Sequence, residues 1–426
     1  MSQPANTASK GTPLWRMSKK FSFAAEKIIP DSMVFCLILT FVVFIAALIG
    51  TESGFLTLIG YWQEGLWTQL TFAMQMSLMV VVCATTARSS QMTKGMESLS
   101  KLVRTPVAAM ILLMSFGFVS SFLNWAFCTI VTPILAMQLS KNIKGLHFPM
   151  MLAAGYTCMI FGQCLGPTAS VYAVIATEGH QFADLIGVIS QDVSVYNSVN
   201  VIIWVILAIT FMALAIFTRP PKHELVEFNS EVKDNTVDYS VKNIETLADR
   251  LNASRIIMWA IGLAGIIYIV HSFITLGFMG SLSVTFIILL FIVANCFLYS
   301  SPRAFIEAHK ANMFLTCEIM IQFPFYGGIM GIMQYSGLAT IIVGFMVSIG
   351  TASTMPILAF LSASIVNLFI PSQGGQWAIQ GQLIIDAAQQ SGADVVTCIN
   401  AFVHGDEATN LLQPLYLIPA LAVVNM

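Results

Sequence analysis

Charged residues are scarce in this chain. They make up 9% of its 426 residues, whereas 57% of the residues are hydrophobic; an ordinary soluble domain carries about 25% charged residues. The net charge of −2 says nothing about nucleic acid or acidic partners, and we expect no nucleic acid as a partner. The composition therefore predicts an all-α polytopic membrane protein. Its apolar runs long enough to span a bilayer are Ser32–Gly50, Gln69–Thr86, Met150–Phe161 with its continuation, Ser198–Thr218, Arg255–Ile274, Ser281–Leu298 and Ala311–Gln334.

We expect no cleavable signal, and the sequence has no closely paired cysteines. Residues 1–28 are polar and basic, and no small-residue cleavage site follows the first apolar run. The eight cysteines lie in apolar stretches without a CxxC pair, which predicts buried free thiols and neither a disulfide framework nor a zinc site. No Ser/His/Asp, His-cluster or Gly-rich phosphate signature stands out. We therefore expect no enzyme activity and no cofactor, and a membrane-embedded enzyme is the main rival class.

Basic residues are distributed unevenly along the chain. All 19 lysines and arginines fall in five clusters, and loops between the clusters carry acidic residues such as Glu64 and Asp184. Because cytoplasmic loops collect Lys and Arg, each cluster is predicted to be cytoplasmic, and so is the N-terminus. The clusters are Lys10–Lys27, Arg88–Arg104, Lys141–Lys144, Arg219–Arg255 and Arg303–Lys310.

The segment Ser364–Gln382 interrupts an otherwise apolar region. Pro371 and the pair Gly374-Gly375 would break helical backbone hydrogen bonds, which a bilayer tolerates only where the break is buried in protein or lines a cavity. The flanks, Ile357–Ile370 and Trp377–Ile385, are each too short to span but long enough to dip in and return. We predict a re-entrant hairpin over 354–385; a Gly-rich turn outside the membrane is the alternative.

A second interrupted segment, Pro106–Ser140, lies between two cytoplasmic clusters. It is interpreted as a hairpin entered from the cytoplasm (106–140), with two short crossings as the alternative. The pair Ser121-x-x-Asn124 in this segment recurs as Ser364-x-x-Asn367, and Gln75 recurs as Gln322 on a span running the other way. These matches predict inverted repeats with two opposed re-entrant hairpins and broken helices, which are typical of secondary transporters.

The repeats predict a division of the chain. Residues 1–218 form the first membrane repeat, 219–254 a cytoplasmic linker, 255–278 an extra helix, and 279–426 the second repeat, with its hairpin entered from outside. The second repeat ends before the last helix that the first would require, so we expect this helix to be missing.

The predicted site contains no buried basic residue, since no Lys or Arg is assigned to a hydrocarbon span and none follows Lys310. An anion would have to bind to helix N-termini and to hydroxyl and amide side chains. Ser121, Asn124, Ser364 and Asn367 could also hold Na⁺, whereas interhelical hydrogen bonding is the alternative for the two asparagines. The predicted substrate-binding residues are Ser121, Asn124, Ser364, Asn367, Ser372, Gly374, Gly375 and Gln376.

Carboxyl groups within an apolar stretch are candidates for ion coupling. Asp406 and Asn410 lie one helical turn apart on one helix face and are predicted to couple transport to Na⁺ or H⁺. A position at the membrane rim is the alternative, and it is the better interpretation of Glu407 and Glu318.

Three motifs carry a resemblance to a known family. The segments Gln322–Gly328, Asn367–Gly381 and Gly405–Pro419 resemble the bacterial short-chain fatty acid transporter family, and the likeness takes in most of the chain. It implies transport of short monocarboxylates such as acetoacetate and butyrate. The chain departs from the family pattern at Gln373, where the family tends to have Gly. More distantly it is similar to an ion-transporter superfamily whose anion carriers use two opposed hairpins, move like an elevator and often form homodimers.

We therefore expect a secondary active transporter of short-chain monocarboxylates in the bacterial inner membrane, coupled to Na⁺ or H⁺. A symporter of dicarboxylates or other small organic anions is the alternative. A channel is disfavoured because two opposed dead-end hairpins close a pathway. We expect a small carboxylate and the lipid bilayer as partners, with a homodimer as the implied assembly.

Overall fold

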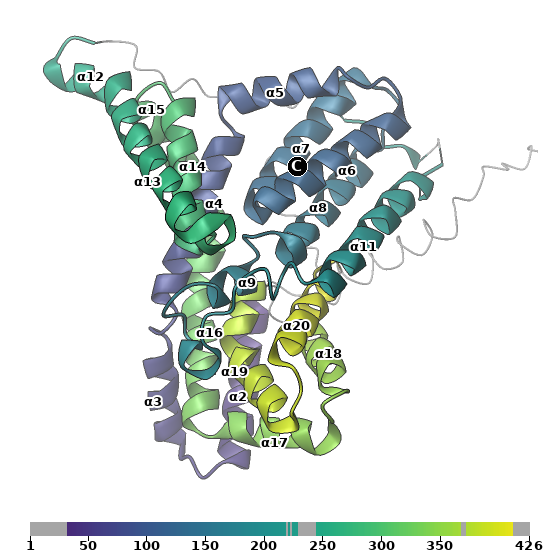
Figure 1. Ribbon diagram of the computed structural model, residues 1–426, viewed down its shortest axis with the longest axis vertical. Coiled ribbons are helices and arrows are strands. Elements are labelled where there is room, and N and C mark those ends of the chain that lie inside the picture. The colour runs from purple at the N-terminus through teal and green to yellow at the C-terminus, as the bar shows by residue number, and fades with distance from the viewer. Residues whose placement is uncertain (1–31, 219, 222–223, 229–243, 368–371, 412–426) are drawn as a thin grey trace, which may run out of the picture.

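The computed structural model describes residues 32–218, 220–221, 224–228, 244–367 and 372–411, and every regular element within them is helical (Figure 1). The predictions for Pro371, the first basic cluster and the end of the chain lie outside the described residues. The helices are α2 (Ser32–Gly50), α3 (Phe55–Gly65), α4 (Leu70–Ala87), α5 (Ser90–Ser100), α6 (Pro106–Leu123), α7 (Trp125–Asn142), α8 (Phe148–Leu165), α9 (Ser170–Ile175), α10 (Ala183–Ile186), α11 (Ser198–Phe217), α12 (Leu247–Asn252), α13 (Arg255–Ser281), α14 (Val284–Leu298), α15 (Pro302–Asn312), α16 (Cys317–Tyr335), α17 (Leu338–Ile349), α18 (Met355–Asn367), α19 (Gln373–Ser391) and α20 (Val395–Asn410).

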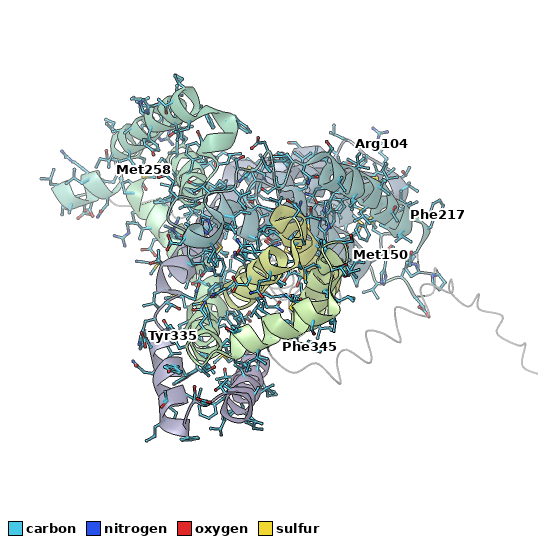
Figure 2. All side chains as sticks on the ribbon, turned by 60° about the horizontal axis from the view of Figure 1, so that its bottom comes forward. Arg104, Met150, Phe217, Met258, Tyr335 and Phe345 are labelled. Carbon is cyan, nitrogen blue, oxygen red and sulfur yellow. The ribbon has the colours of Figure 1, made fainter. Side chains whose placement is uncertain are left out.

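The apolar runs of the sequence form helices, as predicted. Six helical segments of the described chain are long and apolar enough to cross a membrane; they include Pro106–Leu123, from the predicted first hairpin, whereas Val284–Leu298, from a predicted span, is shorter. Helix α11 lies on the outside of the bundle, and its Phe217 is 75% exposed (Figure 2). By contrast, α8 is almost wholly buried. A bilayer solvates apolar side chains, so an outer helix such as α11 can remain apolar all round.

The cysteines are free thiols, as predicted, but one of them is not buried. Seven are buried, whereas Cys317 is exposed. The prediction was wrong for this residue because the first turn of α16 lies at the surface of the bundle, where the neighbouring Glu318 is also exposed.

Two helical hairpins approach each other from opposite ends of the molecule. Helices α6 and α7 come from the end where α5 lies, and α18 and α19 come from the end where α17 lies (Figure 1). The first hairpin turns at Asn124, which ends α6 and caps α7. The second ends α18 at Asn367 and begins α19 after Ser372. The breaks thus fall where the Asn and Ser signals of the sequence placed them; entry into a membrane stays a prediction.

Each hairpin packs closely against the helix that follows it, and one glycine allows the contact. A Cβ added at Gly162 of α8 would overlap the carbonyl oxygen of Ser121 in α6, and one at Gly405 of α20 would overlap that of Phe360 in α18. Gly162 and Gly405 are 243 residues apart, the same interval that separates Ser121 from Ser364. The interval of the sequence repeat thus relates the two glycines, although it does not relate the carbonyl groups that they contact, at Ser121 and Phe360.

Candidate functional site

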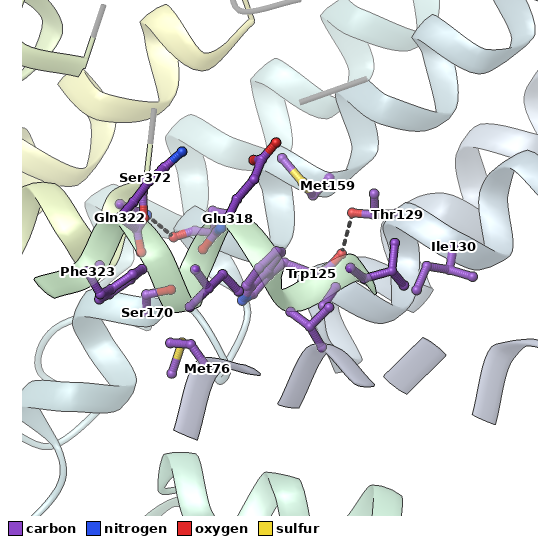
Figure 3. Close-up of a pocket in the computed structure, with 17 residues that line it drawn as sticks. Met76, Trp125, Thr129, Ile130, Met159, Ser170, Glu318, Gln322, Phe323 and Ser372 are labelled. Atoms are coloured by element: carbon purple, nitrogen blue, oxygen red, sulfur yellow. Dashed lines mark hydrogen bonds between the residues drawn. The ribbon is translucent and has the colours of Figure 1, made fainter. Parts of the chain in front are cut away.

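A cavity of about 160 Å³ lies where the two hairpin tips meet (Figure 3). Its walls come from α4, α7, α8, α9 and α16, from the segment just before α16, and from the start of α19. The lining residues are Met76, Val80, Trp125, Ala126, Thr129, Ile130, Met159, Gln163, Ser170, Leu315, Glu318, Ile319, Gln322, Phe323, Ser372, Gln373 and Gly374.

Two helix N-termini face this cavity. The Asn124 side chain accepts a hydrogen bond from the Phe127 N–H at 3.0 Å, and the Ser372 hydroxyl accepts one from the Gly375 N–H at 3.3 Å. Each capping side chain thus accepts a hydrogen bond from the backbone N–H of the third residue of its helix. The first two residues of α7 and of α19 line the cavity, and N–H groups at these positions have no acceptor within the helix. The two positive helix ends make the cavity suited to an anion.

The remaining walls combine apolar and uncharged polar side chains. Met76, Ile319 and Phe323 supply apolar surface, and Thr129 and Gln322 supply polar groups (Figure 3). No Lys or Arg lines the cavity within the described chain. Glu318 is the charged exception, and its side chain is exposed. The arrangement can hold a small organic anion whose carboxylate meets the helix ends and whose short tail meets the apolar wall.

A buried carboxyl pair lies behind the tip of the second hairpin. Asp406 and Glu407 of α20 are 0% and 1% exposed. The Asn410 amide donates to Asp406 Oδ2 at 3.1 Å, so the structure brings together the two residues predicted to couple an ion. The Gln373 amide donates to Glu407 Oε1 at 3.1 Å. Glu407 is therefore buried inside the protein, and its depth in the membrane stays a prediction.

Several predicted site residues form hydrogen bonds within their hairpin or with the helix that follows it. The Ser121 hydroxyl donates to Phe118 O, and the Ser364 hydroxyl donates to Gly405 O, both at 2.9 Å. The Asn367 amide donates to three acceptors on α20, namely Asp406 O, Thr409 Oγ1 and Asn410 Oδ1. These residues do not line the cavity, so their part in substrate or Na⁺ binding stays a prediction.

The residues at the start of α19 are helical, which changes the interpretation of its glycines. A Cβ at Gly374 would lie 2.7 Å from the ring of Phe72, and one at Gly375 would lie 2.6 Å from the ring of Tyr326. Both glycines thus make room for aromatic rings, and Gly374 also lines the cavity. The Gln376 amide donates to Ala363 O and to Gln380 Oε1, so it joins α18 to α19. Ser372 and Gly374 are the predicted residues whose atoms form the wall.

Three wall residues carry little signal in the sequence, namely Thr129, Gln163 and Ser170, which are uncharged polar residues in or beside apolar runs. Gln373 lies in the interrupted segment and departs from the family pattern, but it was not predicted to bind substrate. One signal is present for Gln163, since it precedes Asp406 by the same 243 residues that relate the repeats. The repeat interval could therefore have placed Gln163 near the site from the sequence alone.

Sequence comparisons with known proteins point to one family. A family model described as short chain fatty acid transporter matches residues 13–426. A Haemophilus influenzae protein named "Putative short-chain fatty acid transporter" is 30% identical over 421 residues, covering 96% of this chain and 93% of the relative. An Escherichia coli protein of the same name is 29% identical over 414 residues, with the same coverage.

The fold is similar to that of a solved transporter. The Alcanivorax borkumensis YdaH transporter, described as having an unusual topology, superposes with a TM-score of 0.55 at 16% identity and covers 92% of this chain and 89% of its own. At that identity the likeness concerns the fold alone.

Proposed function

This chain belongs to the short-chain fatty acid transporter family, and we propose that it is a secondary active transporter that moves short-chain monocarboxylates across the bacterial inner membrane. One observation carries the proposal: two helix N-termini converge on a cavity with no basic side chain in its described wall. Two helix ends can neutralise about one negative charge between them. A second carboxylate would remain uncompensated in surroundings of low polarity, where a buried charge costs several kcal/mol.

The apolar wall favours short aliphatic tails. Each buried methylene contributes about 0.8 kcal/mol, and the cavity of about 160 Å³ has room for a few of them. Monocarboxylates of about two to six carbons therefore fit better than long-chain fatty acids.

Monocarboxylates are expected to outcompete dicarboxylates. In proteoliposomes that contain the purified protein, butyrate and acetoacetate should inhibit uptake of labelled butyrate at concentrations at least about tenfold below those needed for succinate, because about 1.4 kcal/mol of unpaired charge already gives that ratio. Butyramide, which lacks the charge, is the control and should compete poorly. Succinate or citrate competing as well as butyrate would instead identify a dicarboxylate symporter.

Coupling and movement complete the proposal. A cation, Na⁺ or H⁺, accompanies the anion, and Asp406 with Asn410 forms the coupling element. The hairpins α6–α7 and α18–α19 re-enter the membrane from opposite sides and carry the cavity across it in an elevator-type movement, within a homodimer. The opposed hairpins and the shared cavity at their tips support this model.

The membrane topology follows from the charge distribution. Lys101 and Lys310 should face the cytoplasm and Glu64 and Asp184 the outside, since basic residues concentrate at one end of each crossing. The helices α5 and α12 lie at one end of the molecule and α3 at the other, which supports this assignment (Figure 1). Single cysteines introduced at these positions in a cysteine-free variant should react with an impermeant maleimide in intact cells only at positions 64 and 184. Strong external labelling at position 310 would overturn the inverted repeat.

A further inference from the structure

The carboxyl pair on α20 is buried among groups that cannot neutralise two negative charges. Glu407 interacts with Tyr156 and Cys164 of α8, with Tyr172 of α9 and with Asp406 beside it. From α19 it receives the hydrogen bond of Gln373. No Lys, Arg or His is among these described neighbours, and the nearby His404 of α20 is bonded to Trp204 and Asn200 instead. Two ionised carboxylates in such a place would be strongly unfavourable.

In each carboxyl group one oxygen accepts a hydrogen bond and the other is left without a donor. Asp406 Oδ2 accepts from Asn410, and Glu407 Oε1 accepts from Gln373. Asp406 Oδ1 and Glu407 Oε2 are buried and receive no hydrogen bond from another described residue, while the two carboxyl groups interact with each other. One proton between two carboxyl groups satisfies both oxygens, as in other buried carboxylate pairs. A Na⁺ ion fits less well, because the amides that contact the pair present N–H donors to it.

One side chain joins this pair to the cavity. Gln373 is the first residue of α19 and lines the cavity. Its amide nitrogen donates to Glu407 Oε1 and to Gln163 O at 3.0 Å, while its oxygen accepts from the Val171 N–H at 3.2 Å. Gln163 lines the same cavity, and its buried Oε1 has no donor within the described chain. A ligand that moves the start of α19 therefore also moves the donor that holds Glu407.

We infer that Asp406 and Glu407 share a single proton and that Gln373 links this proton site to the substrate cavity, so that H⁺ is the coupling ion. The inference rests on the proposed function. The pair takes up a proton from water when its side of the cavity is open, holds it while the cavity is closed, and releases it on the other side. Release leaves two negative charges together, so it requires water to reach the pair.

The test compares gradient-driven uptake with exchange. Proteoliposomes containing the wild-type protein should accumulate labelled butyrate when an inward H⁺ gradient is imposed without Na⁺. In Glu407→Gln the ratio of this uptake to butyrate–butyrate exchange should fall at least tenfold, because exchange needs no net proton movement. Gln373→Leu, which removes the donor, should lower the same ratio by a smaller factor. Glu97→Gln, at an exposed residue paired with Lys101 on α5, is the matched control.

A second measurement does not depend on reconstitution. When butyrate is added to the purified protein in weakly buffered detergent solution, wild-type molecules whose pair is open to water and has released its proton should take up about one proton per butyrate bound, and Glu407→Gln should take up none. Equal proton uptake by both proteins, or uptake by neither, would overturn the inference. Butyrate accumulation driven by Na⁺ alone would also overturn it and leave the transport function standing. Absence of saturable butyrate transport in the wild type would instead overturn the proposed function.

Discussion

Gly405→Ala should give a protein that loses its stable folded form. The added methyl group would overlap the carbonyl oxygen of Phe360, which is backbone and cannot rotate away. Overpacking commonly costs about 1–3 kcal/mol where side chains can adjust, and the cost at this position should reach or exceed the top of that range. Helices α18 and α20 would have to separate, which would also break the hydrogen bond from Ser364 to Gly405 O.

The chain offers a control for this experiment and a second position at which the same effect can be tested. Gly344 lies in α17 with no heavy atom within 4 Å of an added Cβ, so Gly344→Ala should leave stability unchanged or raise it slightly through helix propensity. Gly162→Ala should behave like Gly405→Ala. Thermal unfolding and size-exclusion profiles in detergent measure all three variants. Equal midpoints for Gly405→Ala and Gly344→Ala would show that the two hairpins are not packed as described.

The helices and their breaks could be predicted because their causes are local. Long apolar runs form helices in a bilayer whatever their neighbours. Asn124 and Ser372 are strong N-cap residues, and each begins a helix. The motifs Ser121-x-x-Asn124 and Ser364-x-x-Asn367 both fall where the first helix of a hairpin ends, while the inverted relation of the two halves stays a prediction.

The wall of the cavity could not be predicted in the same way, because it depends on how each helix is rotated. Ser121 and Ser364 are hydroxyl residues close to the tips, yet their donors are satisfied by nearby carbonyl groups. Gln373 and Glu407 are 34 residues apart and meet only because α19 begins at Gln373. The rotation of each helix about its axis follows from tertiary packing at glycines and aromatic rings. Local sequence patterns therefore do not predict which side chains face the cavity.

Gln322→Glu should abolish most transport by adding to the wall of the cavity a second negative charge, besides that of Glu318. Gln322 lines the cavity and accepts a hydrogen bond from the Tyr326 hydroxyl at 2.9 Å, which a carboxylate of the same shape can also accept. The packing should therefore survive while the electrostatics change. At an effective dielectric constant of about 20, a unit charge roughly 6 Å from the bound carboxylate opposes it by roughly 3 kcal/mol, which corresponds to about a 100-fold loss of apparent affinity for butyrate.

Gln334→Glu is the matched control for this charge. Gln334 lies on the same helix, outside the cavity, and bonds to Gln382. This variant should keep its affinity for butyrate within about threefold. Uptake kinetics of both variants in proteoliposomes measure these affinities. Lowering the pH should restore the butyrate affinity of Gln322→Glu toward that of the wild type, since protonation of the introduced carboxyl group removes the repulsion. Similar affinity in the two variants at neutral pH would mean that the anion binds elsewhere. A carboxylate in the wall of the binding site must repel the bound anion more strongly than a carboxylate outside that site.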